Sequence, residues 1–157
     1  MVARTRAEIE RIWTGVDGIK KLTDRVIGLG PFGVGLDAFL TWVPGIGPLF
    51  SAGMGGYLLI QAMRARASPG TVMRMFSYLA LDLATDIPDL VFLPVGSVVD
   101  MIFPGHLMAA KALQKDIEST HWVEGAYRDA RASGAHDNHV AKVRATPGLR
   151  RVIYLHD

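Results

Sequence analysis

The sequence predicts an all-α protein built around two apolar helical hairpins, which are membrane-embedded or re-entrant. Half of the 157 residues are hydrophobic and only 20% are charged, so the mean hydropathy of +0.23 is high for one domain of this size. The apolar residues are concentrated in residues 26–63 and 76–110, which contain no Lys or Arg. Proline and glycine break each block near its centre, which is a turn signal. We therefore expect each block to form two helical arms joined by a turn.

Residues 1–25 are predicted to form an amphipathic N-terminal helix. Thr5 and Glu8 have the spacing of a capping box, in which each side chain accepts a hydrogen bond from the other's backbone amide. Apolar residues then recur at helical spacing, opposite a charged side: Ile9, Ile12, Trp13, Val16, Ile19 and Leu22. Such a helix can lie in a membrane interface or pack on the rest of the domain, and the sequence leaves both open.

Residues 26–113 are predicted to form the double-hairpin hydrophobic domain. Its turns are assigned to Pro44, Gly45 and Gly47 in the first block and to Pro94 and Gly96 in the second. Arms of about 15 to 18 residues reach roughly 22 to 27 Å as helices, against about 30 Å of hydrocarbon in a bilayer. Shallow or re-entrant hairpins are therefore as consistent with the sequence as four short spans. A soluble helical bundle, with the same arms buried against each other, is the alternative.

Small residues follow the first predicted turn. Two overlapping pairs have the small-xxx-small spacing that lets helices approach closely: Ser51 with Gly55, and Ala52 with Gly56. These four residues are predicted to lie at a helix-packing contact.

The basic residues lie between and around the apolar blocks. The N-terminal segment, the linker from Arg64 to Arg74 and the C-terminal segment all have a basic excess. By the positive-inside rule, all three lie on the cytoplasmic side of a bacterial inner membrane, with both termini in the cytoplasm. The expected partners are membrane lipids and other membrane protein subunits or a second copy. Nucleic acid is not expected, because the small charge excess forms no continuous footprint.

Three carboxylates within the apolar blocks are candidate functional residues: Asp37, Asp82 and Asp100. A carboxylate in a membrane needs a partner or a water path, so these residues could conduct protons or cations. The alternative is structural, because aspartate also caps helix N-termini, pairs with arginine or lies at the membrane interface.

The sequence predicts no enzyme, no cofactor, no metal site and no catalytic residue. Cysteine is absent, which excludes disulfides and thiolate chemistry. Gly28, Gly30 and Gly33 match the spacing of a dinucleotide-binding loop, but the preceding strand and the later acidic residue are missing. His136 and His139 could share a helix face as metal ligands, but a catalytic zinc needs a third ligand. An exposed loop is the favoured interpretation of this stretch.

Residues 114–157 are predicted to be a soluble C-terminal helix and a polar tail. The helix is expected to run from about Leu107 to Arg131 and to end at Ser133 and Gly134. The apolar run at 152–155 is expected to dock on the domain or on a partner.

The segment from Gly35 to Gly47, followed by Arg74-Met75 and then by Gly96 with Asp100, resembles the family called domain of unknown function 4112. The resemblance covers roughly residues 24 to 115. It implies a hydrophobic, membrane-associated helical domain and supplies no activity. The chain departs from the family pattern at polar positions, with Pro48, Ser97 and Tyr78 where the pattern has aspartate or asparagine.

These observations together predict a small non-enzymatic membrane-associated protein, an accessory or scaffold element of a membrane complex. One alternative is ion or proton transport through the three aspartates. The other is a soluble helical bundle that binds an apolar ligand or a partner helix.

Overall fold

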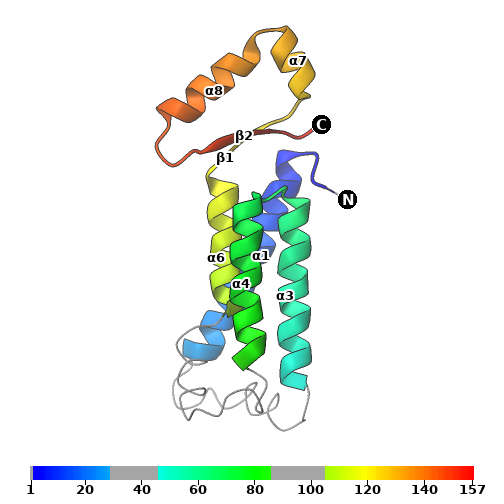
Figure 1. Ribbon diagram of the computed structural model, residues 1–157, viewed down its shortest axis with the longest axis vertical. Coiled ribbons are helices and arrows are strands. Elements are labelled where there is room, and N and C mark those ends of the chain that lie inside the picture. Colours follow the sequence, from blue (N-terminus) through cyan, green and yellow to red (C-terminus); the bar gives the residue numbers. More distant parts are fainter. Residues whose placement is uncertain (1, 29–45, 86–104) are drawn as a thin grey trace.

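The computed structural model describes residues 2–28, 46–85 and 105–157 (Figure 1). Within these residues the protein is mostly helical, as predicted. The helices of the bundle are α1 (Arg6–Gly28), α3 (Ile46–Arg64), α4 (Pro69–Thr85) and α6 (Gly105–Glu118). The C-terminal part, which we call the cap, consists of β1 (Thr120–Val123), α7 (Tyr127–Ala132), α8 (Ala135–Ala145) and β2 (Arg151–Tyr154).

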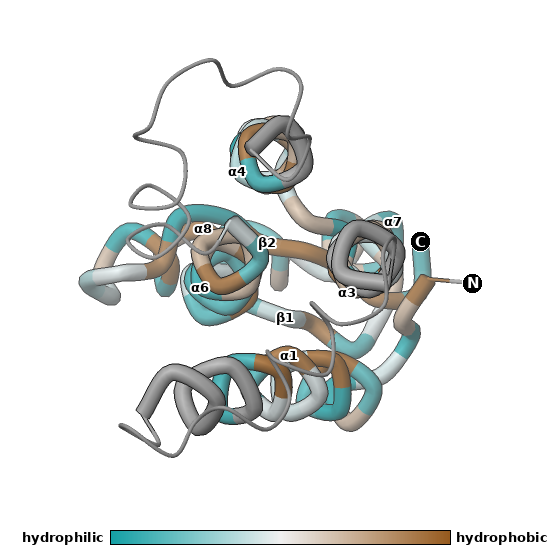
Figure 2. Tube along the Cα trace, turned by 90° about the horizontal axis from the view of Figure 1, so that it is seen from below, coloured by the Kyte–Doolittle hydropathy of each residue, from teal (hydrophilic) through white to brown (hydrophobic). Residues whose placement is uncertain are grey.

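The four bundle helices run alternately up and down, and the cap lies at the end of the bundle where α3 meets α4 (Figure 1). Viewed along the bundle, α3 and α6 lie between α4 on one side and α1 on the other (Figure 2). The largest fully buried side chains of the bundle come from all four helices: Val16, Leu58, Met75 and Leu113. The core is therefore shared by helices that are distant in the sequence.

Helix α1 begins with the predicted capping box. The Glu8 amide donates to Thr5 Oγ1 at 3.2 Å, and the Thr5 amide donates to Glu8 Oε2 at 3.3 Å. The predicted apolar side of the helix is buried in the bundle at Ile9, Ile12 and Val16. The sequence left two placements open for this helix, in a membrane interface or against the rest of the domain. In the structure the helix packs on the rest of the domain.

A tight connection joins α3 to α4. Arg66 has a φ of 48°, in the left-handed region that few non-glycine residues adopt. Ser68 precedes α4 and accepts a hydrogen bond from the Thr71 amide at 3.3 Å on its Oγ. Pro69 is the first residue of α4, where a missing amide hydrogen costs nothing because that amide has no partner within the helix. The connection brings the two helices together as an antiparallel pair.

The C-terminal prediction was wrong in two respects. The helix expected to run to about Arg131 ends at Glu118, and residues 120–123 form β1, which pairs in parallel with β2. The stretch containing His136 and His139 belongs to α8 and is not a loop. Pairing with a strand about 30 residues later overrides the local helical pattern at β1. The end at Ser133 and Gly134 was correct, because α7 stops there and Gly134 has a φ of 75°.

The apolar run at residues 152–155 docks on the domain, which is one of the two outcomes that the sequence predicts. His121 of β1 is opposite Val152 of β2, and the amide of Leu155 donates to the Val123 carbonyl at 2.9 Å. Arg66 continues this contact from the α3–α4 connection, donating to the carbonyl of Tyr154 at 2.9 Å. The cap is thereby attached to the bundle at both of its ends in the sequence.

Within residues 2–28, 46–85 and 105–157, no helix combines the length and the apolar composition that a membrane crossing needs.

Candidate functional site

The outward sides of α3 and α4 are apolar, although they are exposed. Six large hydrophobic residues on these two helices are between 40% and 67% exposed: Tyr57, Ile60, Met63, Met73, Phe76 and Leu81. Soluble proteins expose single apolar residues routinely, whereas larger contiguous apolar patches are typical of interaction surfaces. We call these six residues the apolar face.

Charged residues are sparse along α3 and α4. Helix α3 has no charged residue before Arg64, and α4 has none between Arg74 and Asp82. In contrast, α1 and α6 expose charged side chains at Glu10, Arg11, Lys21, Lys111, Lys115 and Glu118. The bundle therefore has a polar side formed by α1 and α6, and an apolar side formed by α3 and α4.

The small residues of α3 differ in their surroundings. Gly55 is buried against α4, and a Cβ added there would lie 3.2 Å from Leu79 Cδ2. Gly56 has open space where a Cβ would lie, and Ala52 is exposed. Ser51 lies on the same helix. Close approach to another helix is thus seen at Gly55.

Asp82 is the only one of the three candidate carboxylates that lies within the described residues. Its Oδ1 accepts a hydrogen bond from the Gly105 amide at 2.9 Å, and its Oδ2 lies 3.3 Å from His106 Nδ1. The carboxylate therefore caps the N-terminus of α6 from the neighbouring helix. Asp37 and Asp100 lie outside the described residues, so conduction through the three carboxylates stays a prediction.

The predicted turn residues fall mostly outside the described residues. This is so for Pro44, Gly45, Pro94 and Gly96. Gly47 is the second residue of α3, which begins at Ile46. Helices α1 and α4 end, and α3 and α6 begin, at the end of the bundle opposite the cap (Figure 1).

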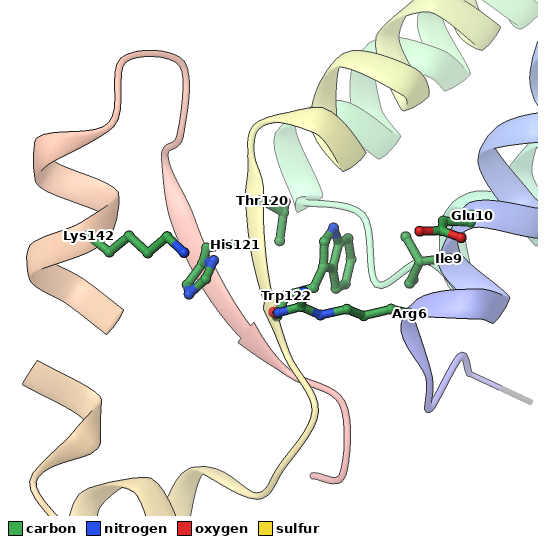
Figure 3. Close-up of a pocket in the computed structure, with 7 residues that line it drawn as sticks. All are labelled: Arg6, Ile9, Glu10, Thr120, His121, Trp122 and Lys142. Carbon is green, nitrogen blue, oxygen red and sulfur yellow. The ribbon is translucent and has the colours of Figure 1, made fainter. Parts of the chain in front are cut away.

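A pocket of about 280 Å³ lies between the bundle and the cap. It is lined by Arg6, Ile9 and Glu10 of α1, by Thr120, His121 and Trp122 of β1, and by Lys142 of α8 (Figure 3). Figure 3 shows Lys142 and His121 pointing toward one another, with the Arg6 guanidinium beside the Trp122 backbone. Arg6 Nη2 donates to the Trp122 carbonyl at 2.6 Å, which fixes the guanidinium at the edge of β1.

Aromatic and imidazole side chains of the cap form a connected cluster. His121 Nε2 lies 3.1 Å from His139 Nδ1, and His136 Nδ1 lies 3.0 Å from the Tyr154 hydroxyl. Tyr127 completes the cluster, with its ring centroid 5.1 Å from that of His136. These contacts attach α8 to both strands of the sheet.

Two members of this cluster have displaced pKa values. Burial lowers the pKa of His121, and the positive charges of Lys142, His139 and Arg6 lower it further. Burial likewise raises the pKa of Tyr154, with smaller contributions from Tyr127 and nearby carboxylates. Burial and the positive charges both favour the neutral form of the His121 imidazole.

His136 and His139, the two histidines that could share a helix face as metal ligands, both lie on α8. The structure directs them to different partners, His136 to the Tyr154 hydroxyl and His139 to His121. Among the described residues, no three His, Cys, Asp or Glu side chains converge as ligands for a metal ion.

Sequence reasoning missed the apolar face and the pocket. Exposed and buried apolar residues alternate along α3 and α4 with the same helical period, so periodicity alone could not separate them. The pocket combines residues from positions 6 to 142, and only the chain fold brings these together. The one sequence signal for the pocket was the basic excess of the N-terminal segment, which includes Arg6.

Comparison with known proteins identifies one family. The model of the family described as domain of unknown function matches residues 12–117. This range contains the four bundle helices except for the first turns of α1 and the end of α6, and it excludes the cap. No curated protein and no solved structure matches the chain. Because the match covers more than half of the sequence, the chain belongs to the domain of unknown function 4112 family.

Proposed function

We propose that this protein is a small non-enzymatic component of a membrane, which acts as an accessory or scaffold element of a membrane complex. The observation that carries the proposal is the apolar face of α3 and α4. Its residues are well exposed, up to 67% for Met73, although each fully buried side chain of this size contributes about 1.5 to 3 kcal/mol. A lipid environment or a membrane partner would remove this area from water.

The distribution of basic residues supports a membrane attachment in which the cap end faces the cytoplasm. Arg64, Arg66 and Arg74 lie at the cap end of the α3–α4 pair, and Arg4 and Arg6 are at the start of α1 beside them. The Ala3 amide, which donates to the Arg64 carbonyl at 2.9 Å, fixes these two segments together. Anionic lipid headgroups attract such residues by about 1 kcal/mol each. The cap end would then lie at the cytoplasmic headgroups.

The sequence between the helices supports insertion. Residues 29–45, between α1 and α3, and residues 86–104, between α4 and α6, contain no Lys or Arg, and their only charged residues are Asp37, Asp86, Asp89 and Asp100. A shallow or re-entrant attachment needs no complete membrane span. The proposed arrangement places the end of the bundle opposite the cap in the bilayer, and the cap in the cytoplasm.

Membrane fractionation tests the proposal. We expect the protein to remain in the membrane pellet after carbonate and high-salt washes, and to require detergent for extraction. The purified protein should also float with phosphatidylcholine vesicles. The double variant Met73→Asn with Phe76→Asn should weaken flotation, because it makes the apolar face polar without changing the core. Ala141→Asn, on the exposed side of α8, is the matched control.

A different result would favour another function of the same face. Recovery in the soluble fraction, with a monodisperse protein in buffer without detergent, would refute membrane attachment. The apolar face would then be the binding surface for a partner helix or an apolar ligand. The same double variant distinguishes this case, since it would leave fractionation unchanged and abolish partner binding.

A further inference from the structure

We propose that the pocket between α1, β1 and α8 binds a phosphate group, through the side chains of Arg6, His121 and Lys142. The ligand is a phosphate monoester or free phosphate, and the monoester can belong to a lipid headgroup. The binding function is separate from the apolar face and does not depend on insertion of the bundle into a membrane.

Three elements each contribute a hydrogen-bond donor to the pocket lining. Arg6 comes from the first turn of α1, His121 from the centre of β1 and Lys142 from the last turn of α8 (Figure 3). A guanidinium provides a planar fork for phosphate oxygens, an ammonium provides a compact charge, and an imidazole provides one further N–H donor. These are the groups that proteins use for phosphate recognition.

The protein holds two of these donors in position. The Arg6 amide donates to Glu124 Oε1 at 2.8 Å, and its side chain donates to the Trp122 carbonyl at 2.6 Å. His121 is held through its contact with His139 at 3.1 Å. A guanidinium fixed through one nitrogen still has other N–H groups, and these remain available to a ligand.

Cationic side chains outnumber carboxylates in the pocket lining. Arg6 and Lys142 line it with one carboxylate, Glu10, which leaves an excess of positive charge even with His121 neutral. The Glu124 carboxylate accepts from the Arg6 amide at 2.8 Å and is not part of the lining. The side-chain ammonium of Lys142 forms no hydrogen bond or ion pair with any residue in the described part of the chain. Burial lowers the pKa of His121 most, and the positive charges of Lys142, His139 and Arg6 lower it further. An anion would relieve this repulsion.

The size of the pocket also suits a phosphate group. The pocket volume of about 280 Å³ is many times the roughly 10 to 15 Å³ that one water molecule requires. A phosphate group occupies only part of it, which leaves room for the group that carries the phosphate. Ile9 and Trp122 provide an apolar wall beside the charged residues. The pocket thus suits a phosphate attached to a partly apolar group better than a small inorganic anion alone.

Binding should be linked to the protonation of His121. A bound phosphate dianion would stabilise the imidazolium against the positive charges of Lys142, His139 and Arg6. The Glu10 carboxylate also lines the pocket. The pKa of His121 should therefore rise when phosphate binds. By linkage, affinity should increase as the pH falls through the range in which His121 takes up its proton.

A titration of the full chain tests the site, in the buffer or mild detergent that keeps it monodisperse. Inorganic phosphate is added while the imidazole resonances are followed by NMR. We expect saturable shifts at His121 together with a rise in its pKa. Lys142→Gln should weaken the affinity about fivefold, the effect of losing roughly 1 kcal/mol from one exposed charge. Lys111→Gln removes an equal charge from the exposed side of α6 and should bind phosphate as the native chain does.

A second arm identifies the source of the phosphate. Flotation is compared on vesicles of phosphatidylcholine alone and on vesicles that also contain phosphatidic acid. If Lys142→Gln removes the added binding to phosphatidic acid but Lys111→Gln does not, the ligand is a headgroup. Saturable phosphate binding without this difference indicates a soluble ligand. Flotation on phosphatidylcholine alone reports the apolar face separately, so either proposal can fail without the other.

Two outcomes would overturn the phosphate site. One is the absence of saturable binding with both probes. The other is binding that Lys142→Gln and Lys111→Gln weaken equally, because that result indicates attraction by net charge and no specific pocket.

Discussion

Asp116, near the C-terminal end of α6, forms an ion pair with Arg151, the first residue of β2. The same carboxylate accepts hydrogen bonds from the Ser68 amide at 3.0 Å, from Ser68 Oγ at 2.8 Å and from Thr71 Oγ1 at 3.0 Å. Arg151 also donates through Nε to Thr120 Oγ1 at 2.9 Å. One buried carboxylate thus joins the α3–α4 connection, the last turn of α6 and the sheet of the cap.

Asp116→Asn is expected to destabilise the protein by about 2 to 4 kcal/mol, since it leaves Arg151 without its counter-charge and disturbs several hydrogen bonds at once. Chemical unfolding followed by circular dichroism, in buffer or mild detergent, measures the change. Asp129→Asn, on exposed α7, is the control and should stay within about 0.5 kcal/mol of the native chain. Equal stability of the two variants would mean that the network contributes nothing beyond surface charge.

Gly105→Ala should destabilise the contact between α4 and α6. A Cβ at this position would lie 2.4 Å from the Tyr78 carbonyl oxygen and 2.6 Å from Asp82 Cβ, so the helices would have to separate. Overpacking of this kind costs about 1 to 3 kcal/mol. Gly56→Ala, where the added Cβ meets nothing within 4 Å, should stabilise α3 by about 0.5 to 1 kcal/mol. Thermal unfolding of the two variants measures both changes. A Gly105→Ala variant more stable than Gly56→Ala would contradict this packing.

Leu58→Ala and Ile60→Ala should separate the buried side of α3 from its apolar face. Leu58 is fully buried, so its truncation leaves a cavity and should cost about 3 kcal/mol. Ile60 is 52% exposed, and its truncation should change the free energy of unfolding by less than about 1 kcal/mol while it weakens flotation on vesicles. Loss of flotation in Leu58→Ala, measured on folded protein, would argue against the assignment of these two sides.

Acidification should destabilise the cap through His121. Its pKa is lowered in the folded protein from an ordinary value of 6.5, chiefly by burial, so the unfolded chain binds the proton more readily. The stability from neutral His121 is complete above about pH 6.5 and decreases as the pH falls toward the folded pKa. Unfolding between about pH 7.5 and about pH 5 should show this loss, and His121→Gln should reduce it. An identical pH dependence in His121→Gln would assign the effect to other groups.

Several local features were readable from the sequence because their causes are local. The capping box at Thr5 and Glu8 requires only residues three positions apart, and its two hydrogen bonds are present at the start of α1. The helical period of Ile9, Ile12 and Val16 gave the buried side of that helix. The end of α7 near Gly134 follows from a left-handed backbone conformation that glycine adopts without steric cost.

The C-terminal segment shows where this reasoning stops. Residues 120–123 fit a helical pattern with their neighbours, yet they contain β-branched and aromatic residues that also suit a strand. The choice depends on β2, whose residues pair with them in parallel. Parallel pairing requires a long crossover, here through α7 and α8, and no local pattern reports it.

The sequence by itself determined that the protein is mostly helical, that it belongs to its family and that its apolar and basic residues are segregated along the chain. Only the tertiary structure decided which apolar residues of α3 and α4 face the core, and that Arg6, His121 and Lys142 line one pocket. The reason is that α3 is hydrophobic on nearly every side, so its sequence gives no direction for burial. The contacts with α4 and α6 select Leu58 for the core and leave Ile60 outside.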